Sequence, residues 1–83
     1  MGKKQMAKYD QEADVLYVTL LDDAVDETRE LDDLRLVDYT SDGRVVGIEF
    51  VSPSAGIDLR GVPFADTVEK LIGQSGYQFK VFV

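Results

Sequence analysis

Residues 34–51 read LRLVDYTSDGRVVGIEFV, which is two apolar segments separated by a polar turn. Residues 34–39 and 45–51 are rich in β-branched and aromatic side chains, as β-strands are. Residues 40–44 between them include Gly43, which adopts the positive φ of a tight turn without strain. This stretch predicts an antiparallel β-hairpin, and the rest of the fold can be built outward from it.

Two registers are possible for this hairpin. A two-residue loop would place Leu36 opposite Glu49. A three-residue loop with Gly43 in a bulge would instead place Leu36 opposite Ile48 and Arg35 opposite Glu49. We prefer the second register, because it forms a pair of opposite charges and gathers the large apolar side chains on one face.

In the preferred register the other face of the sheet is also apolar. Such a patch on a soluble protein usually marks an interaction surface. Asp38 is expected on the core side, beside Val46, as a structural carboxylate that accepts hydrogen bonds from turn amides. The candidate surface for self-association consists of Val15, Tyr17, Val37, Tyr39, Val45 and Val51.

The segments before the hairpin add further strands. Residues 14–21 have the strongest strand pattern, and its alternation places Leu16, Val18 and Leu20 on one face. Residues 6–9 and 28–31 are shorter strand candidates, and residues 22–27 are interpreted as an acidic loop. Gly47, in the middle of the predicted strand 45–51, allows another backbone or side chain to approach closely.

Behind the hairpin the sequence predicts one helix and a last strand. Pro63 suits the first turn of a helix, and Gly73 or Gly76 is expected to end it. Residues 57–61 are interpreted as a connector, and residues 77–83 as a final strand that must be paired or covered. The apolar stripe of the helix consists of Phe64, Val68, Leu71 and Ile72.

Together these elements predict an α+β fold, in which a small antiparallel sheet of hairpins or a meander has one C-terminal helix packed on one face and a final short strand. The 83 residues make a single domain, 1–83, with residues 1–5 as a flexible extension. A core of this size is marginal, and the sequence has no cysteine for a disulfide. We therefore expect a homo-oligomer, and a dimer in the first place.

Two residue types that are common in catalytic and metal sites are missing from this sequence. It has neither cysteine nor histidine, and so it lacks thiolate ligands and the commonest general base. Asp10, Glu12 and Asp14 resemble the first half of a calcium loop, but without its glycine and its distant glutamate. We expect no catalytic residue, no metal, no cofactor and no enzymatic activity.

The charge of the chain limits its partners. A formal net charge of −7 at pH 7 disfavours nucleic acid and anionic membranes, both of which need a basic patch. Acidic residues crowd positions 10–33, where Arg29 is the sole basic residue. They form either a solvated rim that maintains solubility or a surface complementary to a basic protein. No signal peptide or membrane span is visible, and we expect a cytoplasmic protein.

Three segments, in order along the chain, resemble the prokaryotic domain-of-unknown-function family 2283. They are residues 9–18 (YDQEADVLYV), 27–31 (ETREL) and 42–49 (DGRVVGIE). Residues 57–63 (IDLRGVP), with the helix and strand behind them, resemble an extension seen in some members, so the resemblance covers nearly the whole chain. It implies a small antiparallel sheet in a cytoplasmic bacterial or archaeal protein, and no established activity. Some members look like antitoxin partners of small basic toxins, and Gln11 stands where the family usually has proline.

These observations favour a non-enzymatic, self-associating protein-interaction module. One alternative is an antitoxin-like acidic partner of a small basic protein. Another is a small-ligand binder with a pocket at a subunit interface, in which Asp38 or Tyr17 would contact the ligand.

Overall fold

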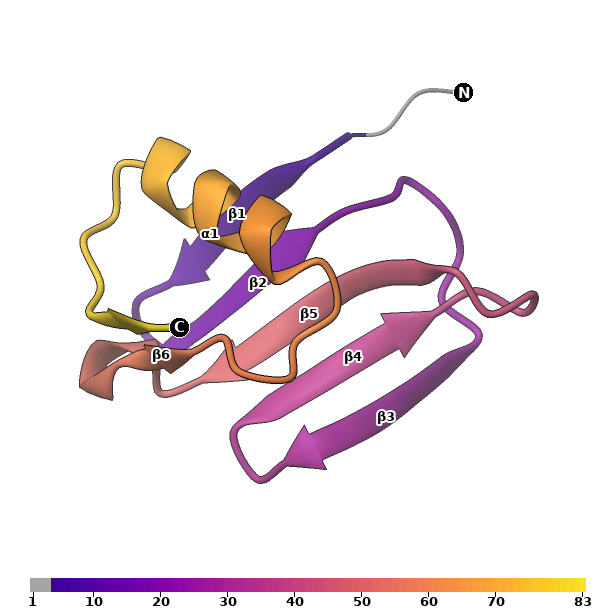
Figure 1. The fold of residues 1–83 in the computed structure, drawn as a ribbon, viewed down its shortest axis with the longest axis horizontal. Coiled ribbons are helices and arrows are strands. Elements are labelled where there is room, and N and C mark those ends of the chain that lie inside the picture. The colour runs from indigo at the N-terminus through magenta and orange to yellow at the C-terminus, as the bar shows by residue number, and fades with distance from the viewer. Residues whose placement is uncertain (1–3) are drawn as a thin grey trace.

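In the computed structural model of this chain, which describes residues 4–83, a five-stranded antiparallel sheet carries a single helix on one face (Figure 1). The strand order is β1-β2-β5-β4-β3. The predicted α+β fold is confirmed, and residues 1–3 of the expected flexible extension lie outside the described residues. The strands of this sheet are β1 (Met6–Asp10), β2 (Val15–Thr19), β3 (Glu27–Asp32), β4 (Arg35–Tyr39) and β5 (Val45–Val51).

The chain after β5 folds back over one face of the sheet. It forms a short 3-10 helix, η1 (Pro53–Ala55), followed by β6 (Ile57–Asp58), α1 (Ala65–Gln74) and β7 (Val81–Phe82). Figure 1 shows α1 and β6 in front of the sheet. Among residues 4–83, no helix or strand covers the opposite face, which we call the outer face. Nor does this part of the chain contain a helix long and apolar enough to cross a membrane.

The turn between β4 and β5 is the predicted three-residue loop. The backbone N–H of Thr40 donates to the carbonyl of Arg44 at 2.8 Å, and the N–H of Gly43 donates to the carbonyl of Thr40 at 3.1 Å. Gly43 has φ +87°, so the expected positive φ at this position is confirmed.

A β-bulge next to this turn shifts the register of β4 and β5 by one residue. The pairing changes from Tyr39–Val45 to Asp38–Gly47, which leaves Val46 as the extra residue. The carbonyl of Val46 accepts backbone hydrogen bonds from Leu20 and Leu21, which follow β2, at 2.8 and 3.1 Å. The bulge therefore joins the hairpin to the strand beside it.

Beyond the bulge the preferred register is wrong. Leu36 pairs with Glu49, not with Ile48, and Arg35 no longer faces Glu49. The shift places Val37 opposite Ile48, where it is fully buried. Burying a valine contributes roughly 1.5–3 kcal/mol, whereas a cross-strand charge pair contributes about 0.2–1 kcal/mol, so burial decides the register.

The core lies between the sheet and the C-terminal elements. Leu16, Val18 and Leu20 are buried on one face of the β2 segment, as predicted. Residues 57–61, which were expected to be only a connector, contribute two core side chains and the strand β6. The other members of the buried cluster are Val37, Ile48, Phe50, Ile57, Leu59, Val62, Val68, Leu71 and Ile72.

The final strand is shorter than predicted. Only Val81–Phe82 is a strand, and it pairs in parallel with β6 through flanking backbone hydrogen bonds of 2.8 Å. Tyr77 and Phe79 pack against Tyr9 of β1, with ring centroids 5.4 and 5.0 Å from that of Tyr9. The expected pairing or covering of this segment is confirmed.

The helix keeps only part of its predicted stripe. Val68, Leu71 and Ile72 are buried, as expected. Phe64 precedes the helix with φ +56° and is 63% exposed, so its assignment to the stripe is wrong. Its left-handed backbone conformation places Phe64 outside the helix, so that the helical periodicity does not apply to it. Of the two glycines expected to end the helix, Gly76 is the one that follows its end, with φ +88°.

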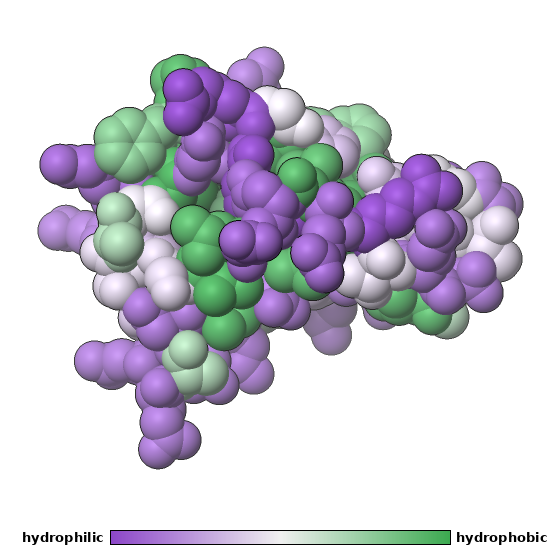
Figure 2. Space-filling model, turned by 90° about the horizontal axis from the view of Figure 1, so that it is seen from below, coloured by the Kyte–Doolittle hydropathy of each residue, from purple (hydrophilic) through white to green (hydrophobic). Residues whose placement is uncertain are grey.

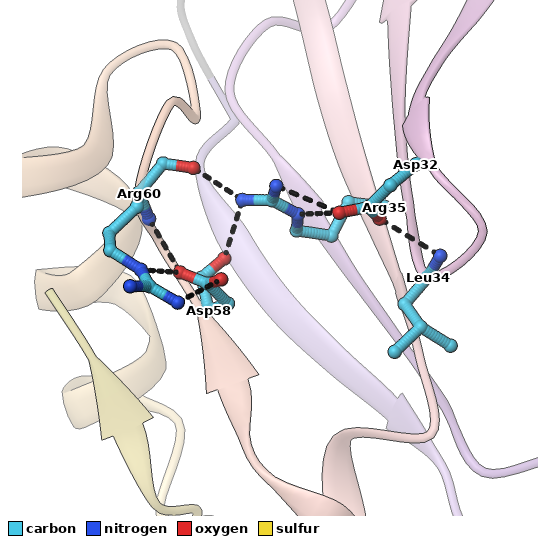
Figure 3. A network of polar contacts seen from close by, with 5 residues as sticks. All are labelled: Asp32, Leu34, Arg35, Asp58 and Arg60. Atoms are coloured by element: carbon cyan, nitrogen blue, oxygen red, sulfur yellow. Dashed lines mark hydrogen bonds and ion pairs between the residues drawn. The ribbon is translucent and has the colours of Figure 1, made fainter.

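Arg35 connects β4 to β6 and to the segment that follows it (Figure 3). Its guanidinium donates to the carboxylate of Asp32 at 2.9 and 3.0 Å, to the carbonyl of Asp58 at 3.1 Å and to the carbonyl of Arg60. Asp58 in turn accepts three hydrogen bonds from Arg60, which hold its pKa well below the ordinary range of an aspartate. The side chain of Arg35 is only 14% exposed. It therefore closes one end of the core with satisfied polar groups.

Candidate functional site

The outer face of the sheet carries apolar side chains that pair across neighbouring strands. Val15 of β2 lies opposite Val51 of β5 on this face. A second row of paired residues crosses the sheet from β1 to β3. That row consists of Lys8, Tyr17, Glu49, Leu36 and Glu30.

The structure divides the candidate self-association surface between the two faces. Val15, Tyr17 and Val51 lie on the outer face and are half-buried. Val37 is fully buried in the core instead, and Tyr39 and Val45 pack against that core. The physical reason is the bulge at residue 46, which exchanges the two faces of β4 relative to the preferred register.

Leu36 is an outer-face residue that the preferred register placed on the core side. Leu36 takes the place on this face that had been assigned to Val37. The alternative two-residue loop does pair Leu36 with Glu49, so the correct pairing of the strands was one of the two considered. The signal that could have found it is burial, since that register places Val37 on the core side, where it is fully buried.

A hydrogen-bonded group of three side chains crosses the outer face. The hydroxyl of Tyr17 donates to one carboxylate oxygen of Asp38 at 2.7 Å, and the hydroxyl of Thr28 donates to the other at 2.5 Å. Asp38 therefore lies on the outer face, and its expected position on the core side, with turn amides as donors, is wrong. Side chains from three strands, β2, β3 and β4, meet at this carboxylate.

Gly47 makes this arrangement possible. A Cβ atom at this position would lie 2.5 Å from the Tyr17 hydroxyl oxygen and 2.6 Å from the carbonyl oxygen of Val18. The predicted close approach at Gly47 is confirmed. Tyr17 crosses over the bare glycine of β5 to reach Asp38 on the next strand.

The chemistry available to this group is hydrogen bonding without proton transfer. Burial, together with the bond to Asp38, raises the pKa of Tyr17 well above that of a free tyrosine. Tyr17 therefore keeps its proton at neutral pH and acts as a fixed donor. Both carboxylate oxygens of Asp38 already accept hydrogen bonds from hydroxyl groups. The group is suited to hold three strands in register.

The outer face carries more negative than positive charge. In the long row, Glu49 stands on the central strand and Glu30 on the edge strand β3, while Lys8 stands on the opposite edge. A shallow groove of about 630 Å³ runs along the β1 side of this face, where Lys8 and Tyr17 form part of its lining. A partner for this face must match an apolar strip with an acidic centre.

The edge strand β3 extends the acidic surface. All six of its residues are exposed, and Arg29 pairs with Glu27 at 2.8 Å while lying 5.1 Å from the ring centroid of Tyr39. In Figure 2, seen from the side on which β3 lies in Figure 1, hydrophilic residues make up most of the surface in view. Charges along an edge oppose the pairing of like strands, so β3 is protected from edge-to-edge aggregation.

The turn with calcium-like spacing is occupied by internal hydrogen bonds. Asp10 accepts the backbone N–H of Ala13 at 3.1 Å. Asp14, with φ +54°, accepts the Tyr9 hydroxyl at 2.9 Å and the Ser54 hydroxyl, and these bonds lower its pKa. Within residues 4–83, no three potential ligands of the His, Cys, Asp or Glu type converge on one point. Asp10 and Asp14 therefore have structural partners.

Comparison with known proteins finds one family. The model of the family described as "Protein of unknown function (DUF2283)" matches residues 7–53. That range contains β2 to β5 and nearly all of β1, and it ends within η1. The helix and the segment 57–63 therefore lie outside the matched part. No curated protein and no solved structure matches the chain.

Proposed function

The chain belongs to the DUF2283 family of proteins of unknown function, and we propose that it is a non-enzymatic protein-interaction module that associates with a second copy of itself through its outer face. The observation that supports this proposal is the asymmetry of the sheet. One face is covered by α1 and β6, while the other presents half-buried Val15, Tyr17, Leu36 and Val51 without cover from the described residues. A second copy would remove these apolar side chains from water.

The charges of the outer face suit a two-fold arrangement. If two outer faces stack about an axis parallel to the strands, β1 of each copy lies over β3 of the other. Lys8 would then approach Glu30 of the second copy, on both sides of the axis. Glu49, on the central strand, would lie close to its own symmetry mate. This contact opposes association, and its removal provides a sharp test.

The mass of the protein in solution tests the proposal. Sedimentation equilibrium at micromolar concentration should give twice the 9.2 kDa of one chain. Leu36→Glu should dissociate the dimer, because it places a charge in a desolvated patch. Val25→Glu, a matched change at a 49% exposed loop position, should leave the mass unchanged. A mass near that of one chain at every concentration would contradict self-association.

A basic protein partner is the second candidate, and the acidic centre of the outer face favours it. Such an interface would pair opposite charges, and the affinity of the complex would therefore fall as salt is added. Glu49→Gln separates the two candidates. It should tighten a homodimer, because it removes the repulsion at the axis, whereas it should weaken the binding of a basic partner. If the variant leaves the dimer mass and its concentration dependence unaltered, the self-association axis does not pass near Glu49.

A further inference from the structure

A second concave site lies on the helix side of the sheet, away from the outer face. It is a groove of about 620 Å³ between residues 20–21, which follow β2, the β4–β5 turn and the start of α1. Its apolar walls are Leu20, Leu21, Val45 and Phe64. This volume lies inside the range of roughly 300–1,000 Å³ that is usual for small-molecule sites.

Phe64 combines two unfavourable features that the fold does not require. It is the residue before α1, with φ +56° and ψ +40°, a conformation that costs a bulky residue of order 1–3 kcal/mol. Its ring is also 63% exposed. A glycine or asparagine at this position would start the helix with less strain and without an exposed ring. The choice of phenylalanine points to a task for the aromatic ring at the mouth of the groove.

The charge balance of the groove decides the kind of occupant. Arg44 is the charged side chain in its lining, and its guanidinium already pairs with Asp23 at 2.8 Å and with Asp42 at 3.1 Å. An anion would therefore meet a neutralised arginine and would lose hydration without compensation. A second copy of this chain, with its charge of −7, would bring its acidic surface against these two carboxylates. A small neutral molecule faces neither cost.

Two polar side chains complete the lining. The amide of Gln5 and the hydroxyl of Thr67 both line the groove, and each can donate and accept a hydrogen bond. A mostly apolar wall with a few polar groups is typical of sites that bind small organic molecules.

We propose that this groove binds a small neutral aromatic molecule, which stacks on Phe64, lies against Leu20, Leu21 and Val45, and directs its polar group toward Gln5 and Thr67. The ring of Phe64 then serves as the exposed half of an aromatic stack, and the strain at its backbone holds the ring at the mouth of the groove. This site is independent of the outer face and of the proposed self-association.

The test uses 1-N-phenylnaphthylamine, a neutral aromatic dye whose fluorescence rises in apolar surroundings. The wild-type protein should bind it saturably, with one dye per chain. Phe64→Gly should weaken binding about tenfold or more, since it removes one face of the stack. This variant should fold, because glycine suits the positive φ at this position. Leu21→Lys, which charges the opposite wall, should weaken binding as well.

Leu34→Ala is the matched control, because Leu34 is a 52% exposed apolar residue that does not line the groove. Its affinity for the dye should equal that of the wild type. Equal affinity in Phe64→Gly, or the absence of saturable binding up to the solubility limit of the dye, would overturn the proposal. So would a fall in the solution mass of Phe64→Gly without dye binding by the wild type, because the groove would then be a contact between copies.

Discussion

Gly47 and Tyr17 show how a single residue sets the geometry of the outer face. The tyrosine ring passes over the glycine, and its hydroxyl reaches Asp38 on the neighbouring strand at 2.7 Å. The sequence predicts a close approach at Gly47 because a glycine in mid-strand is unfavourable unless something needs the space. It does not predict which group approaches, since the partner depends on the register of strands that are distant along the chain.

Gly47→Ala should destabilise the protein by about 1–3 kcal/mol. The added methyl group would lie 2.6 Å from a backbone carbonyl oxygen, which cannot move aside as a flexible side chain can. The free energy of unfolding in urea measures this effect. Tyr17→Ala in the same chain should recover only the part due to the tyrosine, so complete rescue by Tyr17→Ala would show that the backbone contact with Val18 is unimportant.

Arg35→Lys should cost more stability than its conservative nature suggests, about 1.5–3 kcal/mol. A guanidinium spans Asp32 and two backbone carbonyls at once, whereas an ammonium group cannot reach all three acceptors. Arg60→Lys is the control, because that side chain is 72% exposed and its ion pair is screened by solvent, so its loss should change the stability little. Urea midpoints of the two variants provide the comparison, and equal midpoints would contradict a bridging role for Arg35.

At the scale of elements, local patterns predict where strands and the helix lie better than they predict how these elements face one another. The three-residue loop at Gly43 and the buried residues Leu16 and Val18 follow from turn chemistry and alternation. The bulge at Val46 does not, because it arises from the competition between burial of Val37 and a surface charge pair. Residues 57–61 were misjudged for a similar reason, since two isolated apolar residues carry no periodic signal.

The hairpin turn and the helix give opposite predictions for two glycines. Gly43→Val should destabilise by about 1–2 kcal/mol, because valine is strained at φ +87°. Gly73→Ala should stabilise by about 0.5–1 kcal/mol, since Gly73 lies inside α1 and an added Cβ would point into open space. The midpoint of thermal unfolding should therefore fall in Gly43→Val and rise in Gly73→Ala. Shifts of the same sign would count against the positive φ at the turn or against the helical state of Gly73.

At the scale of the whole molecule, the sequence predicts half of the candidate surface. Val15, Tyr17 and Val51 were found because alternation along single strands is a local property. Val37 was misplaced because the outer face is assembled from five strands, and one bulge exchanges the faces of a whole strand. The apolar groove beside Phe64 depends on the left-handed conformation of this residue before the helix, and no periodic pattern in the sequence predicts that conformation.

Stability at high pH tests the assembly of the outer face as a unit. Burial, followed by the bond to Asp38, raises the pKa of Tyr17 above its ordinary value of 10.0. Below about pH 10 the folded and unfolded states both hold the tyrosine proton, so its contribution to stability is fully present. Above that pH the unfolded state releases the proton while the folded state keeps it. The free energy of unfolding should therefore fall with pH, by at most about 1.4 kcal/mol per pH unit and less because solvent reaches part of the ring.

Tyr17→Phe should flatten this fall between pH 10 and 11.5, because phenylalanine has no proton to release. The variant should also lose about 1 kcal/mol at pH 7, since Asp38 loses one of its two hydroxyl donors. Asp38→Asn should give an intermediate slope, because burial still raises the pKa of Tyr17 after the charge is removed. Urea unfolding followed by circular dichroism at each pH measures all three slopes. Parallel curves for the wild type and Tyr17→Phe would mean that Tyr17 titrates as in the unfolded chain, and that the contact across Gly47 does not persist in solution.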